Sequence, residues 1–283
     1  MNEKQNANVF MTCKDYSVSG EDFQLLYDSN NDMLFTSPKP KDQDLGKYYE
    51  SEDYISHTDA KRSVFEKLYH LVKVYSLKKK VTLISKLNNG PGKLLDIGAG
   101  TGDFLVTAKS RNWLVFGTEP NDQARKLAKE KKMNLDSETK DYKDATFDVI
   151  TMWHVLEHVP DLQSQIKELK RLLKPNGHLI IAVPNYKSYD AQFYKSFWAA
   201  YDVPRHLWHF SKKSIQKLFA NEKFNLESVL PMKFDSFYVS LLSEKYKTGK
   251  MNFLKAFSVG LRSNLEGNRT KEFSSHIYVL KKK

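Results

Sequence analysis

Three glycines within five residues, set between an apolar run and a helical pattern, constrain the fold of this 283-residue chain most strongly. Residues 94–97 read as a short buried strand, Gly98, Gly100 and Gly102 follow, and residues 104–109 have a helical pattern. A strand, a glycine turn and a helix in this order open a Rossmann-like unit. The sequence therefore predicts an α/β fold in which a ligand-binding loop follows the first strand of the sheet.

Apolar runs and helical patterns alternate on both sides of this loop. We expect further strands at residues 113–117, 147–152, 178–183, 226–230 and 275–280, and helices at 61–87, 123–132, 160–173, 211–219 and 236–262. Residues 174–177 should form the turn before the strand at 178–183. Such alternation is typical of a doubly wound, mostly parallel sheet that is covered by helices on both faces.

Two parts of the chain fall outside this alternation. Residues 1–60 are polar and turn-rich and show no long helical or strand period, which predicts an N-terminal appendage to a domain over residues 61–283. Residues 184–210 are aromatic and irregular, which predicts an insertion that caps a substrate site after the fifth strand. The aromatic stretches 48–54 and 186–208 fit the walls of an acceptor pocket and core packing equally well.

Composition narrows the choice of partners and location. Lys and Arg outnumber Asp and Glu by 45 to 34, but only seven of the 45 are Arg, the residue that nucleic-acid readout favours. We therefore interpret the net charge of +11 as a lysine surface and expect no nucleic-acid partner. The single cysteine, Cys13, excludes an internal disulfide framework, and no apolar run approaches the roughly 18–20 residues that span a bilayer. A cytoplasmic location is expected.

The spacing of the glycine loop argues against a dinucleotide. The pattern G-x-G-x-x-G would need a glycine at Asp103, whose carboxylate at a helix N-terminus is expected to repel a pyrophosphate. S-adenosylmethionine carries an adenosine, a sulfonium and an amino-acid tail but no phosphate. Asp96 can attract the ammonium of that tail, and Glu119, at the end of the second strand, can accept hydrogen bonds from the ribose hydroxyls.

At these residues the sequence resembles the class I S-adenosylmethionine-dependent methyltransferases. Residues 96–102, 117–120 and 173–179 are similar to three motifs of that class, and the resemblance covers roughly residues 90–230. Residues 147–159 and 204–210 resemble the methyltransferase 23 subgroup, which is related to the ubiquinone-biosynthesis O-methyltransferases. The resemblance implies a seven-stranded sheet and methyl transfer to a small or medium-sized acceptor.

Loop chemistry and resemblance together give a candidate cofactor site, in which Trp153 and His154 are assigned by the resemblance alone. Its residues are Asp96, Gly98, Ala99, Gly100, Thr101, Gly102, Glu119, Pro120, Trp153 and His154. A methyltransferase acting on RNA or another nucleic acid remains the alternative function.

The resemblance also bears on the appendage. Members of the subgroup often carry a zinc-ribbon-like segment with C-x-x-C pairs ahead of a sequence similar to residues 35–40, FTSPKP. Here Asp28 and Asn31 stand where the nearer pair would be, so we expect that the zinc is lost.

Histidines supply the candidate catalytic residues. Residues 154–158 match the zinc-hydrolase pattern H-x-x-E-H, but that pattern requires a long helix and Pro160 interrupts one, so a zinc hydrolase is a remote alternative. The resemblance implies that Glu157 and His158 could hold magnesium, while His158 could equally be a hydrogen-bonded cap; no metal ligand is assigned. His206 and His209 lie in the insertion, where either could be a general base or part of an aromatic clamp. The candidate catalytic residues are His158, His206 and His209.

Overall fold

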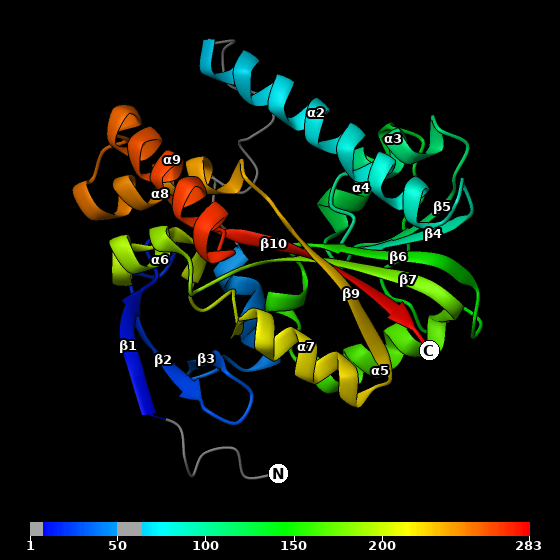
Figure 1. Ribbon diagram of the computed structural model, residues 1–283, viewed down its shortest axis with the longest axis horizontal. Helices are drawn as coiled ribbons and strands as arrows, with labels where there is room; N and C mark the ends of the chain where they lie inside the picture. The colour runs from blue at the N-terminus through cyan, green and yellow to red at the C-terminus, as the bar shows by residue number, and fades with distance from the viewer. Residues whose placement is uncertain (1–7, 50–63) are drawn as a thin grey trace.

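The computed structural model describes residues 8–49 and 64–283, and its centre is a six-stranded, mostly parallel sheet (Figure 1). The strands are β4 (Lys93–Ile97), β5 (Leu114–Thr118), β6 (Phe147–Trp153), β7 (Leu173–Pro184), β9 (Phe224–Pro231) and β10 (Ser275–Lys282), in the order β5-β4-β6-β7-β10-β9. The first four are parallel, and β10 runs antiparallel to both β7 and β9. The chain moves from β4 out to β5 and then returns to the other side of β4. This makes a topological switch point between β4 and β6, where open α/β sheets bind ligands.

Helices cover both faces of the sheet, which confirms the predicted doubly wound architecture. One face carries α2 (Val64–Leu87), α3 (Asp103–Lys109) and α4 (Asp122–Glu130), and the other carries α5 (Leu162–Leu172) and α7 (Lys212–Asn221). Figure 1 shows the two layers on opposite sides of the strands. In α5 the apolar residues Leu162, Ile166, Leu169 and Leu172 recur at intervals of three or four and are buried against the sheet.

Four details differ from the sequence predictions. Within the described residues the sheet has six strands, and a single bridge between Thr118 and Asp136 lies where a seventh edge strand was expected, because residues 134–141 are mostly polar. Residues 174–177 were predicted as a turn but belong to β7. Residues 236–262 were predicted as one helix but form α8 (Asp235–Thr248) and α9 (Phe253–Thr270), because Gly249 ends α8 in the left-handed conformation with φ +74°. Helix α5 begins after the cap Asp161, later than predicted.

The appendage forms a small antiparallel sheet from short strands, although its sequence shows no long strand period. Strands β1 (Asn8–Lys14), β2 (Asp22–Asp28) and β3 (Met33–Ser37) pair in order, followed by the short 3₁₀ helix η1 (Asp42–Tyr49). Strand β8 (Trp208–His209) of the insertion completes this sheet by pairing with β3. At the β2–β3 turn, the Asn31 side chain donates a hydrogen bond of 2.6 Å to Asp28, at the positions where the cysteine pair was sought.

The insertion and the appendage share a hydrophobic core. The insertion contains helix α6 (Tyr189–Tyr194) and the turns η4 (Lys195–Phe197) and η5 (Ala199–Tyr201). Tyr194, Trp198, which lies between the two turns, and Tyr201 are all buried and pack in one cluster with Leu25 and Leu34. Of the two roles considered for these aromatic residues, core packing therefore describes these three. The stretch 48–54 lies largely outside the described residues.

A buried ion pair joins the same two parts. The guanidinium of Arg205 contacts both carboxylate oxygens of Asp202 at 3.0 and 2.7 Å and one oxygen of Asp15, in the turn after β1, at 3.1 Å.

Among the helices described, none is both long and apolar enough to cross a membrane.

Candidate functional site

The glycine loop after β4 is built from left-handed backbone and one close contact. Gly98, Gly100 and Gly102 have φ values of +68°, +55° and +78°, which glycine adopts without steric cost. A Cβ on Gly98 would lie 2.5 Å from Cγ2 of Val155, which follows β6, whereas a Cβ on Gly100 would meet no atom within 4 Å. The loop is therefore clamped at Gly98 and faces open space at Gly100, as a cradle for a ligand would.

Glu119 lies beside this loop, directly after β5. Its Oε2 accepts a hydrogen bond of 2.9 Å from the backbone N–H of Gly100, and its Oε1 accepts one of 2.9 Å from that of Asn121. A carboxylate has about four acceptor positions, so both oxygens keep capacity for hydroxyl donors. The carboxylate is thus fixed at the position where the sequence predicted a ribose contact.

Asp96 ends β4 and is buried next to a cation that the sequence did not single out. Burial raises the pKa of Asp96 to about 7, although Thr151 Oγ1 donates a hydrogen bond of 2.6 Å to its carboxylate. Lys80 of α2 lies near, with its Nζ 4.1 Å from the centre of the Trp153 ring, and burial lowers the pKa of this lysine. The site therefore offers one acidic and one basic group, which suits the two charges of an amino-acid tail.

Asp103 does not act as predicted. Its carboxylate oxygens lie 2.6 Å from Nζ of Lys73 and 2.6 Å from Nζ of Lys131, and although burial opposes ionisation, these cations hold its pKa below the usual value. Because two cations compensate this charge, the argument that Asp103 repels a pyrophosphate was wrong. The case against a dinucleotide rests instead on the glycine spacing.

Trp153 and His154 lie at the carboxyl end of β6, next to the loop. The indole Nε1 of Trp153 is buried and has no hydrogen-bond partner among the described residues. His154 has a φ of +57°. Its Nδ1 lies 3.3 Å from Glu157 Oε1, and its Nε2 lies 3.0 Å from Oδ2 of Asp235, which is the first residue of α8. Burial opposes the charge on His154, but the two carboxylates outweigh it and raise its pKa to about 10. His154 is therefore an imidazolium that links the sheet to α8.

A second cluster lies one turn further, in η3 (Leu156–His158). One ligand atom each from Glu157, His158 and His206 lie within 4.8 Å of one another, and the rings of the two histidines meet edge to face at 4.5 Å. Glu157 is 1% exposed, and its Oε2 has no hydrogen-bond partner in the part of the chain that the structure describes. A backbone hydrogen bond from the Leu207 N–H to the Glu157 carbonyl holds the insertion against η3.

The tautomers of these histidines follow from their backbone partners. His158 Nδ1 lies 3.1 Å from the carbonyl oxygen of Arg205, and His206 Nδ1 lies 2.9 Å from that of Ala200. A carbonyl only accepts, so each Nδ1 carries a proton, and the Nε2 of His206 lies 3.9 Å from Asp202 Oδ2. Burial lowers the pKa of His158 to about 4, which keeps this ring neutral at pH 7.

The H-x-x-E-H pattern does not form a zinc-hydrolase site. Its residues lie in a turn rather than a long helix, and the group of possible ligands contains Glu157, His158 and His206 but not His154. One carboxylate and two imidazoles fit a divalent ion in number, and this donor set suits a transition metal better than magnesium.

His209 lies beside His206, with ring centroids 6.3 Å apart, but is not part of the group of possible ligands. Its Nε2 is 3.2 Å from Thr36 Oγ1 on β3, its ring contacts Tyr201, and it is 4% exposed. Burial lowers the pKa of His209 well below its usual value. Its surroundings are the core between the appendage and the insertion.

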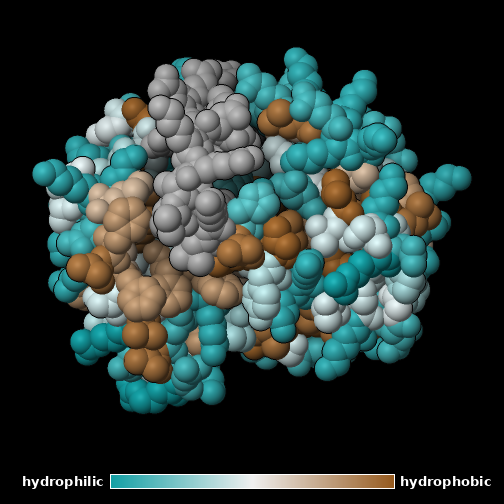
Figure 2. All heavy atoms as spheres, turned by 90° about the horizontal axis from the view of Figure 1, so that it is seen from above, coloured by the Kyte–Doolittle hydropathy of each residue, from teal (hydrophilic) through white to brown (hydrophobic). Residues whose placement is uncertain are grey.

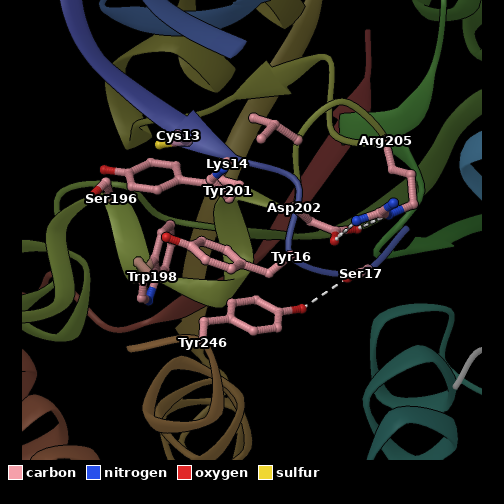
Figure 3. Close-up of a pocket in the computed structure, with 11 residues that line it drawn as sticks. Cys13, Lys14, Tyr16, Ser17, Ser196, Trp198, Tyr201, Asp202, Arg205 and Tyr246 are labelled. Atoms are coloured by element: carbon pink, nitrogen blue, oxygen red, sulfur yellow. Dashed lines mark hydrogen bonds and ion pairs between the residues drawn. The ribbon is translucent and has the colours of Figure 1, made fainter. Parts of the chain in front are cut away.

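Figure 3 shows a pocket between the appendage, the insertion and α8, lined by residues that include Tyr16, Trp198 and Tyr246. The cavity measures about 10 Å³, enough for about one water molecule, so it is too small for an acceptor. Cys13 also lines it, and burial raises the pKa of this thiol to about 12, so the thiol stays protonated near pH 7.

Comparison with known proteins decides the family. The model of a methyltransferase domain, Methyltransf_23, matches residues 68–229, which is more than half of the chain. This chain belongs to that methyltransferase family.

Relatives and solved structures agree with this family. The ubiquinone biosynthesis O-methyltransferase of Coxiella burnetii is 31% identical over 143 residues, covering 47% of this chain and 58% of the relative. That of Actinobacillus pleuropneumoniae is 37% identical over 107 residues, covering 33% and 46%. The chain thus matches about half the length of these relatives.

Two solved structures share the fold of this methyltransferase domain. A possible histamine N-methyltransferase from Thermotoga maritima has a TM-score of 0.51 at 19% identity, with 76% of this chain and 96% of the neighbour covered. Geranyl diphosphate C-methyltransferase from Streptomyces coelicolor A3(2) has a TM-score of 0.52 at 15% identity, with 81% and 88% covered. Both show the class I methyltransferase fold that the sequence predicted.

Sequence reasoning missed two residues of the candidate site. Lys80 is the third of three consecutive lysines, and successive residues of a helix point about 100° apart. The sequence alone therefore does not show which of the three lysines faces the site. Asp235 lies 81 positions after His154 in the chain, and no local pattern marks it. The other candidate cofactor residues lie in the glycine loop, as Ala99 and Thr101 do, or follow β5, as Pro120 does.

Proposed function

We propose that this protein transfers the methyl group of S-adenosylmethionine to a small or medium-sized acceptor. The observation that carries the proposal is the glycine loop at the switch point, clamped at Gly98 and open at Gly100, with the Glu119 carboxylate fixed beside it. When bound, the cofactor supplies an electrophilic methyl group on a cationic sulfur. Because two relatives are named as ubiquinone biosynthesis O-methyltransferases, we infer that the acceptor atom is a hydroxyl oxygen.

In this proposal residues of α2, of β4 and of the segment after β5 position the cofactor. Glu119 accepts hydrogen bonds from the ribose, while Asp96 and Lys80 pair with the ammonium and carboxylate of the tail. Such positioning lowers a barrier by about 7–11 kcal/mol in favourable systems, so methyl transfer can proceed with little chemical assistance.

His206 is our candidate for the group that takes the hydroxyl proton. Its Nδ1–H is fixed on the carbonyl of Ala200, which leaves the Nε2 lone pair beside Glu157 and His158. His158 belongs to the same cluster, whereas His209 is enclosed by Thr36 and Tyr201 and is the weakest of the three candidates. If a divalent ion binds here, Glu157, His158 and His206 would hold it, and it would stabilise negative charge on the acceptor oxygen.

The test is to incubate the purified protein with methyl-labelled S-adenosylmethionine and an extract of small metabolites, and to follow the label by mass spectrometry. We expect a labelled small molecule with wild type and none with Glu119→Ala at limiting cofactor concentration. Label in the RNA fraction instead would support the nucleic-acid alternative. Absence of both label and cofactor binding would contradict the proposal. We place this activity in the cytoplasm, where a reduced Cys13 is stable.

A further inference from the structure

Helix α9 packs with its small residues inward and its large apolar residues outward. The inward face is buried, its largest apolar side chain is that of Val259, and its members are Ala256, Val259, Gly260, Ser263, Asn264 and Gly267. The outward face, called here the α9 apolar face, consists of Leu254, Phe257, Leu261 and Leu265, which are 86%, 60%, 43% and 60% exposed.

This arrangement is the reverse of an ordinary surface helix, which buries its large apolar side chains. The spacing of three or four residues places the four side chains on one stripe along α9. Figure 1 places α9 beside α8 at the edge of the molecule, and Figure 2 shows brown and tan side chains gathered on that side. A stripe of this kind on a protruding helix fits a flat apolar surface.

Positive charge runs alongside the α9 apolar face. Residues 249–271 contain five Lys or Arg and one acidic residue, Glu266, so the segment carries a net charge of +4. Lys255 and Arg262, seven positions apart, are exposed and lie over aromatic rings of α6, at 5.2 Å from the Phe193 ring and 4.9 Å from the Tyr189 ring. Two copies of this surface would bring like charges together, which disfavours self-association and favours an anionic partner.

We propose that the α9 apolar face docks on an anionic phospholipid membrane, with its leucine and phenylalanine side chains among the acyl chains and Lys255 and Arg262 against the headgroups. An amphipathic helix with an apolar stripe and a basic flank binds a bilayer in this way without crossing it. The inference does not depend on the proposed function. The α9 apolar face is connected to the candidate site through α8, which packs against α9. Asp235, the first residue of α8, contacts His154 at 3.0 Å.

The first experiment is co-sedimentation of the full chain with vesicles of phosphatidylglycerol and phosphatidylcholine, or of phosphatidylcholine alone. We expect binding to the anionic vesicles. This binding should weaken when the salt concentration rises from 0.05 M to 0.5 M, because the Debye length falls to roughly one-third. The double variant Leu254→Ser/Leu261→Ser should lose about a hundredfold or more of this affinity, because it removes two large apolar side chains that would lie among the acyl chains. The matched control is Leu114→Ser/Leu127→Ser, which removes two exposed leucines, 54% and 37% exposed, from β5 and α4.

The second experiment keeps the proposal testable if a leucine variant folds poorly. Ser258→Cys introduces a thiol on the exposed side of α9, and because Cys13 is buried, an environment-sensitive fluorophore will label the new thiol selectively. We expect a blue shift and higher emission with anionic vesicles. No vesicle binding by wild type, or equal binding by the α9 double variant and wild type, overturns the proposal. So does a wild-type dimer in sedimentation velocity that the α9 double variant abolishes, since the face would then join two copies.

Discussion

Replacement of Gly98 by alanine tests how the glycine loop is held. At φ +68° the left-handed backbone costs a residue with a Cβ roughly 1–2 kcal/mol. The new Cβ would also lie 2.5 Å from Cγ2 and 3.0 Å from Cγ1 of Val155, and overpacking of this kind costs about 1–3 kcal/mol. We therefore expect Gly98→Ala to lower the free energy of unfolding by about 2–5 kcal/mol in total.

Gly100→Ala is the matched control, because it has the backbone cost without the contact. Its φ is +55° and no atom lies within 4 Å of the point that the new methyl group would occupy, so we expect a loss of only about 1–2 kcal/mol. At roughly 2–4 °C per kcal/mol, the two variants should melt several degrees apart.

A double-mutant cycle separates the two causes. Val155→Ala removes both contacting methyl groups, so it should recover about 1–3 kcal/mol in the Gly98→Ala background and nothing in the Gly100→Ala background. The assay is urea unfolding of the single and double variants at pH 7. Equal losses for Gly98→Ala and Gly100→Ala, with no coupling to Val155→Ala, would falsify the claim that the loop is clamped against the residues after β6.

Three further outcomes are expected. The pKa of His154 is raised to about 10, so its contact with Asp235 stabilises the fold fully below pH 6.5, and this stabilisation is lost as the pH rises through about 10. In urea unfolding at pH 6.5, 8 and 9.5, the difference in stability between wild type and His154→Gln should shrink as the pH rises. A constant difference would contradict this. Arg205→Ala leaves two carboxylates without their buried cation and should cost about 3–5 kcal/mol of stability, and a change under 1 kcal/mol in thermal unfolding would refute the buried link. His206→Asn should lower methyl-transfer turnover by about 10²–10⁴-fold with intact cofactor affinity, whereas His209→Asn should change mainly stability; the reverse pattern in steady-state kinetics would reassign the base.

The parts of the fold that the sequence predicts well depend on local patterns. The strand at residues 93–97, the glycine loop and the first turn of α3 lie within some 15 residues, and each follows from its neighbours along the chain. Helix starts belong to the same class: the helix expected to begin at residue 211 is α7, and the side chain of its N-cap Ser211 accepts a hydrogen bond from the Ser214 N–H.

The parts that were missed depend on contacts between distant segments. Strand β3 pairs with β8, so the Thr36 N–H donates to the Leu207 carbonyl across 171 positions, and neither segment has a strand pattern long enough to predict this. Asp103 was misjudged for the same reason, since Lys73 and Lys131 approach it from other elements. The conformation of the glycine loop can therefore be predicted from the sequence, but the net charge around it can be read only from the structure.

Isothermal titration calorimetry of S-adenosylmethionine and its demethylated product tests the central claim most directly. We expect both to bind wild type, and we expect Glu119→Ala to weaken binding by about 1.5–3 kcal/mol, the usual contribution of hydrogen bonds to a charged group. NAD should give no heat. Tight binding of NAD with no heat from S-adenosylmethionine, or equal affinity of wild type and Glu119→Ala for S-adenosylmethionine, would contradict the account.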